Sequence, residues 1–187
     1  MQELNDYTRP FDPSLKLTDF SKEALIRMFQ GACKDYLAID GSWSSLMREK
    51  LGDETAFAYA KEMWWRWGVA AEVRRTREAL NIWETDVEAV MKYCQFTMSL
   101  GGLYDVDVKL IDKNHGEYTI KHCNSLDYFE RHGDMALLKQ GCENLCVPLN
   151  QLSADCFNPK IKWVPIKLPP RQNKNEPACI WEIRMEQ

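Results

Sequence analysis

The stretch YDVDVKLIDKNHGEYTIKHC, residues 104–123, decides the fold class of this chain. Apolar and polar side chains alternate from Tyr104 to Leu110, which is the pattern of a strand with one buried face. Turn-forming residues follow at 114–116, and the alternation resumes at 117–123. The two runs therefore predict a β-hairpin.

On both sides of this hairpin the sequence predicts helices, and further strands follow it. Helical spacing begins near residues 18, 42, 53, 69 and 85, and Asp40-Gly41-Ser42 is expected to separate the first two helices. The remaining elements are helices at 125–132, 135–140 and 148–157 and strands at 161–165 and 179–185. Helices grouped before a small sheet favour an α+β fold with an antiparallel sheet.

The chain is interpreted as one domain, residues 1–187. Its 187 residues fall within the usual size of a single domain, and no repeat or linker-like stretch divides it. Residues 1–100 are expected to form a mainly helical layer that packs against the sheet and short helices of residues 101–187.

Composition excludes several classes of protein. Apolar residues make up 45% and charged residues 28% of the chain, which is typical of a soluble globular protein. The net charge of −4 argues against nucleic-acid binding by bulk charge, so the basic stretch 160–174 is interpreted as a solvated edge. No apolar run approaches the ~20 residues of a membrane helix, and no signal peptide is recognisable. We therefore expect a cytoplasmic protein without a membrane partner.

Seven cysteines are the strongest lead to function. The cytoplasm keeps thiols reduced, and an odd count fits a disulfide framework poorly. Cys33 and Cys94 fall on apolar faces of predicted helices and are interpreted as core residues. The other five crowd the last third of the chain: Cys123, Cys142, Cys146, Cys156 and Cys179.

A metal site is one hypothesis, because thiolates ligate zinc and other soft metals. Its ligands would come from Cys123, Cys142, Cys146, Cys156 and Cys179, with His122 beside them, and its metal would be zinc or iron. The spacing is not that of a structural zinc site, since Cys142 and Cys146 form the one close pair in the sequence. His122 shares a predicted strand face with apolar neighbours, so a core histidine is the alternative.

A nucleophilic thiolate is the second hypothesis. Cys142 follows Gly141 at the end of a short predicted helix, and a base or positive group nearby would lower its pKa. Cys123 ends a predicted strand. Its neighbour His122 points to the opposite face and cannot easily serve as its base.

The helical half offers a candidate ligand pocket. Tyr36, Asp40 and Trp43 surround the expected break between the first two helices. Trp65 points to a different side of its helix from the neighbouring tryptophans, towards either a cavity or the N-terminal arm. Aromatic walls with one carboxylate suit a planar or cationic organic molecule.

An ordered series of motifs in the C-terminal half resembles a known family. The series is Cys123, Glu130-Arg131-His132-Gly133, Cys142, Phe157-Asn158-Pro159, Pro169-Pro170 and Cys179-Ile180-Trp181. It is similar to a family of uncharacterised cytosolic proteins of anaerobic prokaryotes, related to L-2-amino-thiazoline-4-carboxylate hydrolases and, more distantly, to vinyl-reductase-type ligand-binding domains. The element Tyr36…Asp40-Gly41…Trp43 also resembles that family.

The resemblance implies a cavity between helices and sheet that holds a small organic molecule. Cys123, Cys142 and Cys179 would lie near one another there, and Arg131 would orient an anionic group. The hydrolases open a thiazoline ring, which requires a thiolate or a metal-activated water to attack the carbon between nitrogen and sulfur. Where related sequences carry a further cysteine, this chain has Trp163-Val164-Pro165, which weakens the case for a multi-cysteine metal centre.

The leading hypothesis is therefore a small-molecule enzyme or binding protein, hydrolase-like towards a cyclic C–N or C–S compound. Cys142 is the preferred nucleophile or ligand, with Cys123 beside it. The expected ligand contacts are Tyr36, Asp40, Trp43, Trp65 and Cys179. The alternative is a non-catalytic metal- or cofactor-binding accessory or sensor protein. Nothing in the sequence decides the oligomeric state.

Overall fold

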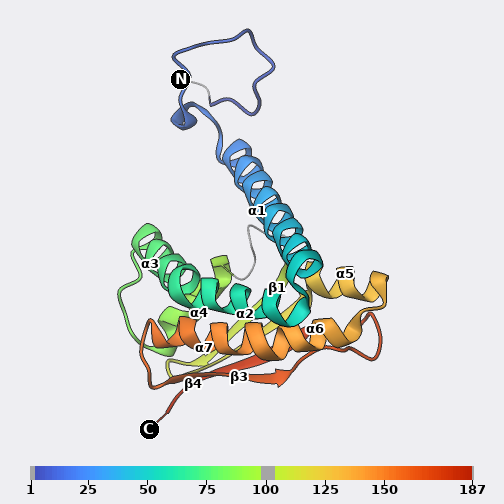
Figure 1. The fold of residues 1–187 in the computed structure, drawn as a ribbon. Coiled ribbons are helices and arrows are strands. Elements are labelled where there is room, and N and C mark those ends of the chain that lie inside the picture. The colour runs from blue at the N-terminus through green and yellow to red at the C-terminus, as the bar shows by residue number, and fades with distance from the viewer. Residues whose placement is uncertain (1–2, 98–103, 187) are drawn as a thin grey trace.

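Four antiparallel strands form one sheet in the order β1-β2-β4-β3. The computed structural model describes residues 3–97 and 104–186. The strands are β1 (Asp105–Asp112), β2 (His115–His122), β3 (Ile161–Lys167) and β4 (Cys179–Met185). With the helices in Figure 1, they confirm the α+β prediction, and each strand lies where the alternating pattern predicted one.

The hairpin between β1 and β2 turns earlier than expected. The Asn114 N–H donates a hydrogen bond to Asp112 Oδ1 at 2.7 Å, and β2 begins at His115. Gly116, expected in the turn, lies within β2, where a Cβ would come within 2.6 Å of the Met91 sulfur. The glycine is therefore needed for close packing of a helix on the strand rather than for the turn.

The helices of the described residues are α1 (Lys22–Leu51), α2 (Asp53–Met63), α3 (Val69–Leu80), α4 (Val87–Thr97), α5 (Asn124–His132), α6 (Met135–Gly141) and α7 (Val147–Asp155), preceded by a 3₁₀ turn at Leu17–Asp19. Two of them, α4 and α7, pack directly on the sheet. α4 packs against β1 and β2, and α7 packs against β3 and α3. α1 packs against α2 and leads away from the sheet in Figure 1, so the expected helical layer is incomplete.

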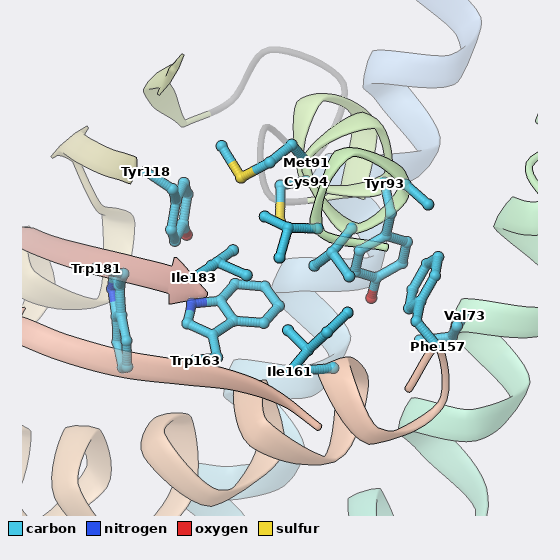
Figure 2. Packing of buried hydrophobic residues seen from close by; sticks show 14 of the residues in the cluster. Val73, Met91, Tyr93, Cys94, Tyr118, Phe157, Ile161, Trp163, Trp181 and Ile183 are labelled. Carbon is cyan, nitrogen blue, oxygen red and sulfur yellow. The ribbon is translucent and has the colours of Figure 1, made fainter. Parts of the chain in front are cut away.

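The main core lies between the sheet and helices α3, α4 and α7 (Figure 2). Its largest fully buried side chains include Trp163, Trp181, Tyr93 and Tyr118. The rings of Tyr118 and Trp163 meet edge to face with centroids 5.9 Å apart. Cys94 is completely buried in this cluster, which confirms its interpretation as a core residue.

The predicted break at Asp40-Gly41-Ser42 is wrong, because α1 continues through it as one helix of 30 residues. The Ser45 hydroxyl donates to the Gly41 carbonyl oxygen at 2.8 Å within the helix. One glycine costs a helix about 1 kcal/mol, which is less than ending and renucleating it. Cys33 lies half-buried on this protruding helix, so its interpretation as a core residue is also wrong.

Two helices expected to end at glycine also continue, each through a single π-turn. α2 runs into α3 through Trp64–Gly68, and α6 runs into α7 through Cys142–Cys146. The second π-turn directly precedes Pro148, which lacks the N–H for an ordinary helical hydrogen bond. A helix can thus pass a glycine or proline when one turn takes in an extra residue.

A buried arginine ties the loop before β4 to α5. Only 7% of the Arg171 side chain is exposed, and its Nε and Nη2 donate to the two carboxylate oxygens of Glu130 at 2.8 and 2.7 Å. Nη2 also donates to Asp127 Oδ1 at 3.2 Å. The hydrogen bonds from Arg171 hold the pKa of the Glu130 carboxyl below its ordinary value.

Replacing Gly68 by alanine should destabilise the fold, because a Cβ there would lie 2.2 Å from the Trp64 ring. Overpacking of this kind typically costs about 1–3 kcal/mol in the free energy of unfolding. Gly31→Ala is the matched helical control: among the described residues no neighbour lies within 4 Å of its added Cβ, and alanine favours a helix. Urea denaturation should give shifts of opposite sign, and an unchanged Gly68→Ala variant would contradict the packing of Trp64 on Gly68.

Replacing Arg171 by methionine should lower the free energy of unfolding at pH 7 by about 1–3 kcal/mol, as expected for lost charge-assisted hydrogen bonds. A lowered carboxyl pKa stabilises the fold above the unfolded value, ordinarily 4.5, and this contribution is lost as pH falls through the folded value. The deficit should therefore shrink in denaturation at pH 3.5. Arg131→Met, on the exposed side of α5, is the control, and an equal deficit at both pH values would contradict the assignment.

Candidate functional site

Two cysteines in the second π-turn form a hydrogen-bonded thiol pair. The S–H of Cys142 donates to the sulfur of Cys146, which lowers the pKa of Cys146 and raises that of Cys142. Cys146 is exposed as a residue, although burial of its sulfur opposes the lowering of its pKa, and Cys142 is partly buried. Because the thiolate is the reactive form of cysteine, the geometry favours Cys146 over the predicted Cys142 as a nucleophile.

Cys123 and Cys179 join this pair from the sheet. Cys123 directly precedes α5 after the end of β2, and Cys179 begins β4, where it pairs with Ile120 of β2. Negative charge on either thiol raises the pKa of Cys142 further, so all four sulfurs lie within electrostatic reach of one another. The structure thus brings the three predicted cysteines into one region and adds Cys146.

Burial keeps the two sheet thiols protonated. Desolvation raises the pKa of Cys179 to about 12, although the Trp181 Nε1–H donates to its sulfur at 3.0 Å. Desolvation also raises the pKa of Cys123. At neutral pH these two thiols therefore stay protonated and uncharged. Cys146, whose pKa is lowered, is the member of the cluster that forms a thiolate most easily.

The described residues do not assemble the predicted metal site. All seven cysteines are free thiols. Across residues 3–97 and 104–186, no group of three or more His, Cys, Asp and Glu side chains is arranged to hold a metal ion. His122 is exposed, with Nδ1 3.1 Å from Asp127 Oδ2, so the alternative of a core histidine is wrong as well.

Tyr104 links the thiols to the helical half. Burial is the main cause that raises the pKa of its hydroxyl, and the Cys123 and Cys146 thiolates raise it further. Asp40 of α1 acts on the same hydroxyl, which also hydrogen-bonds with the Ser125 side chain. Tyr104 therefore remains a neutral O–H donor between Asp40 and the thiol cluster.

A cavity of about 190 Å³ opens beside the same π-turn. Its walls come from α1, α2, Trp64 of the first π-turn and Leu145, the residue before Cys146. The lining is mostly apolar and aromatic, with two charged groups: Asp40, Trp43, Ser44, Met47, Arg48, Ala56, Phe57, Tyr59, Ala60, Met63, Trp64 and Leu145. Such a lining, with few polar groups, is typical of small-molecule sites.

Two carboxyl groups in and near this cavity have raised pKa values. Desolvation raises the pKa of Asp40. It also raises that of Glu72, although the Tyr93 hydroxyl donates to Glu72 Oε1 at 3.2 Å. Burial raises the pKa of Tyr36 as well, and both carboxylates add to that shift.

Only some of the predicted ligand contacts lie at the cavity. Asp40 and Trp43 line the cavity, and Tyr36 reaches it through an edge-to-face contact with Trp64, centroids 6.4 Å apart. Trp65 is 49% exposed and does not line it; Trp64 takes the place predicted for Trp65. Trp64 follows Ala56 and Ala60 at a spacing of four, so ordinary helix geometry places it on the cavity side.

The arginine that was predicted to bind an anion, Arg131, does not line the cavity. Arg131 is exposed, and its Nε donates to the Asp127 carbonyl oxygen of its own helix at 3.2 Å. Arg48 lines the cavity instead, with its Nε 2.8 Å from Asp53 Oδ1. Sequence reasoning missed Arg48 and Tyr104, and it gave Cys146 no role beyond the candidate metal site. For Cys146 a signal exists, since residues four apart share a helix face.

Comparisons with known proteins give one match. The model of a protein family of unknown function (DUF6125) matches residues 18–185. No curated protein and no solved structure matches this chain. The matched range includes every residue of the thiol cluster and the cavity. In the described part of the chain, no helix is both long enough and apolar enough to span a bilayer.

Iodoacetamide should alkylate Cys146 before the other six thiols at pH 7.5, because its lowered pKa gives it the largest thiolate fraction. Cys142→Ala removes the donated hydrogen bond and should slow the reaction at Cys146 several-fold. Cys156→Ala, near the end of α7, should leave it unchanged. Peptide mass spectrometry of samples quenched at successive times measures the alkylation rate of each of the seven cysteines. First reaction at Cys142, or equal rates throughout, would contradict this geometry.

Proposed function

Because the chain belongs to the family of unknown function DUF6125, whose description names no activity, we propose its function from its own side chains. The protein is a thiol-dependent enzyme or binding protein for a small organic molecule held in the cavity whose wall includes Leu145, the residue before Cys146. The observation that carries this proposal is the hydrogen bond from Cys142, which lowers the pKa of Cys146, in the same π-turn that supplies Leu145 to this mainly apolar cavity.

The charges of the cavity define the chemical class of the ligand. Asp40 and Arg48 lie eight residues apart on α1, so their backbones are separated by about 12 Å along the helix. The aromatic rings of Trp43, Phe57 and Trp64 surround the space between them. This arrangement suits a planar molecule with an amidine-like group towards Asp40 and an anionic group towards Arg48.

The size of the cavity limits the ligand further. Its volume of about 190 Å³ lies below the roughly 300–1,000 Å³ of sites for drug-sized molecules. A single five- or six-membered ring with small substituents is therefore the appropriate size. The resemblance of the cysteine motifs to thiazoline-carboxylate hydrolases supports the same class, a cyclic C–N or C–S compound.

The proposed reaction is a hydrolytic ring opening. The Cys146 thiolate adds to the ring carbon bonded to both nitrogen and sulfur, and the ring C–S bond breaks. The departing sulfur takes a proton from a water molecule, and the hydroxide left behind adds to the same carbon, after which the Cys146 thiolate leaves. One molecule of water is consumed, and the enzyme is regenerated.

Proton NMR of the purified protein with a panel of 2-amino-thiazoline and cyclic amidine carboxylates tests this proposal. Ring-opened product should form, and Cys146→Ser should reduce its rate by ~100-fold or more. Cys156→Ser is the matched control and should retain full activity. Asp40→Asn should weaken binding of the amidine-bearing compounds. Unchanged turnover by Cys146→Ser would overturn the assignment of the nucleophile.

Protection and metal content distinguish the alternatives. A compound that shields Cys146 from iodoacetamide without being turned over would identify a binding protein. Stoichiometric zinc or iron in protein purified without added metal, lost in Cys142→Ser, would support the metal-binding accessory protein instead. Neither shielding nor turnover with any member of the panel would refute the proposed ligand class.

A further inference from the structure

One surface of α1 carries a coiled-coil seam, and at Tyr36 and Trp43 it borders the side that faces Trp64 and the cavity. Seven residues alternate at spacings of four and three, which places them at the a and d positions of three heptads. They are Leu25, Phe29, Ala32, Tyr36, Ile39, Trp43 and Leu46. In an ordinary surface helix these positions would face the protein core.

All seven seam residues are exposed. The exposed fraction is 70% for Ile39, 61% for Trp43 and 59% for Phe29. Figure 1 shows why: α1 leads away from the sheet towards the N-terminus, and it meets α2 near its other end. Large exposed apolar surfaces of this kind mark interaction sites in soluble proteins.

We propose that α1 pairs with α1 of a second copy of this chain in an antiparallel coiled coil. With the two-fold axis midway between residues 37 and 38, Ala32 lies opposite the partner's Trp43. Tyr36 then lies opposite the partner's Ile39, and Phe29 opposite the partner's Leu46. The largest side chain of the seam thus meets the smallest, which is the complementarity that close packing requires.

The charges beside the seam select this direction and register. In a parallel pair, Asp35 at position g would lie beside the partner's Asp40 at position e, twice per dimer. An antiparallel pair shifted by one heptad would set Asp35 against the partner's Asp35. In the proposed register Asp35 faces Ser42 and Asp40 faces Cys33, so no like charges meet.

The area of the seam is sufficient for a stable dimer. With Ile26 and Met28 at its edge, the exposed apolar surface is on the order of 800 Å² per chain, the usual share of one partner in a specific interface. A second copy also supplies what this surface needs: an apolar helix of equal length with matching small and large positions.

The pairing also bears on the cavity. Trp43 belongs both to the seam and to the cavity wall, and Leu46 lies next to Met47 of that wall. The partner's Ala32 and Phe29 therefore cover the outer side of the cavity. The dimer does not depend on the proposed chemistry, since its evidence is the seam alone.

Light scattering coupled to size exclusion, at tens of micromolar protein, tests the dimer. The full chain should have the mass of two copies, and Ile39→Asp and Phe29→Asp should each shift it to one. Ile166→Asp, at a position 61% exposed on β3, is the matched control and should remain dimeric. Far-UV circular dichroism verifies that the variants stay folded. A monomeric wild type, or a dimer unchanged by both seam variants, would overturn the proposal.

A distance measurement tests the direction. A spin label at Glu23, attached through an introduced ketone side chain because the chain has seven cysteines, should give a distance of about 45 Å between copies in an antiparallel pair. A parallel pair would bring the two labels within about 20 Å. Pulsed dipolar spectroscopy that finds the shorter distance would overturn the antiparallel arrangement.

Discussion

A π-turn takes one extra residue into a helix, and everything beyond it is rotated by about a hundred degrees. The described structure depends on two such turns. At Cys142–Cys146 the turn sets two thiols within hydrogen-bonding distance, presents Leu145 to the cavity and lets α7 continue onto β3 despite Pro148. At Trp64–Gly68 the Trp64 ring lies over a glycine and lines the same cavity. Both turns lie against one space between α1 and α2.

The sheet supplies the rest of the thiol cluster. Antiparallel pairing of β2 with β4 places Cys179 beside Ile120, three residues before Cys123. The Arg171 contacts with Glu130 and Asp127 hold α5, which begins directly after Cys123, against the loop that leads into β4. Four cysteines spread over more than fifty residues therefore meet because of strand order, and the hydrogen bond within the π-turn distinguishes Cys146 from the others.

Much of this arrangement follows from local patterns in the sequence. Alternation predicts the four strands, and Asp86 before an apolar run predicts the start of α4, where its carboxylate accepts from the Ala89 N–H at 3.0 Å. The π-turns are not predictable in this way, because Gly68 and Gly141 are ordinary signals for a helix end and Pro148 for a helix start. Trp64 lines the cavity rather than Trp65, and we propose Cys146 rather than Cys142 as the nucleophile. Arg48 was missed because tertiary contact alone distinguishes it from other surface arginines.

The most direct test of this account is a ¹³C NMR titration of the cysteine Cβ signals, which change on thiol ionisation. In protein labelled at cysteine, the Cys146 signal should titrate below the ordinary thiol pKa of 9.0, and this midpoint should move upwards in Cys142→Ala. Cys142 and Cys179 should remain protonated over the same range. A Cys146 midpoint at or above 9.0, or one unaffected by loss of Cys142, would contradict the central claim that the π-turn activates this thiol.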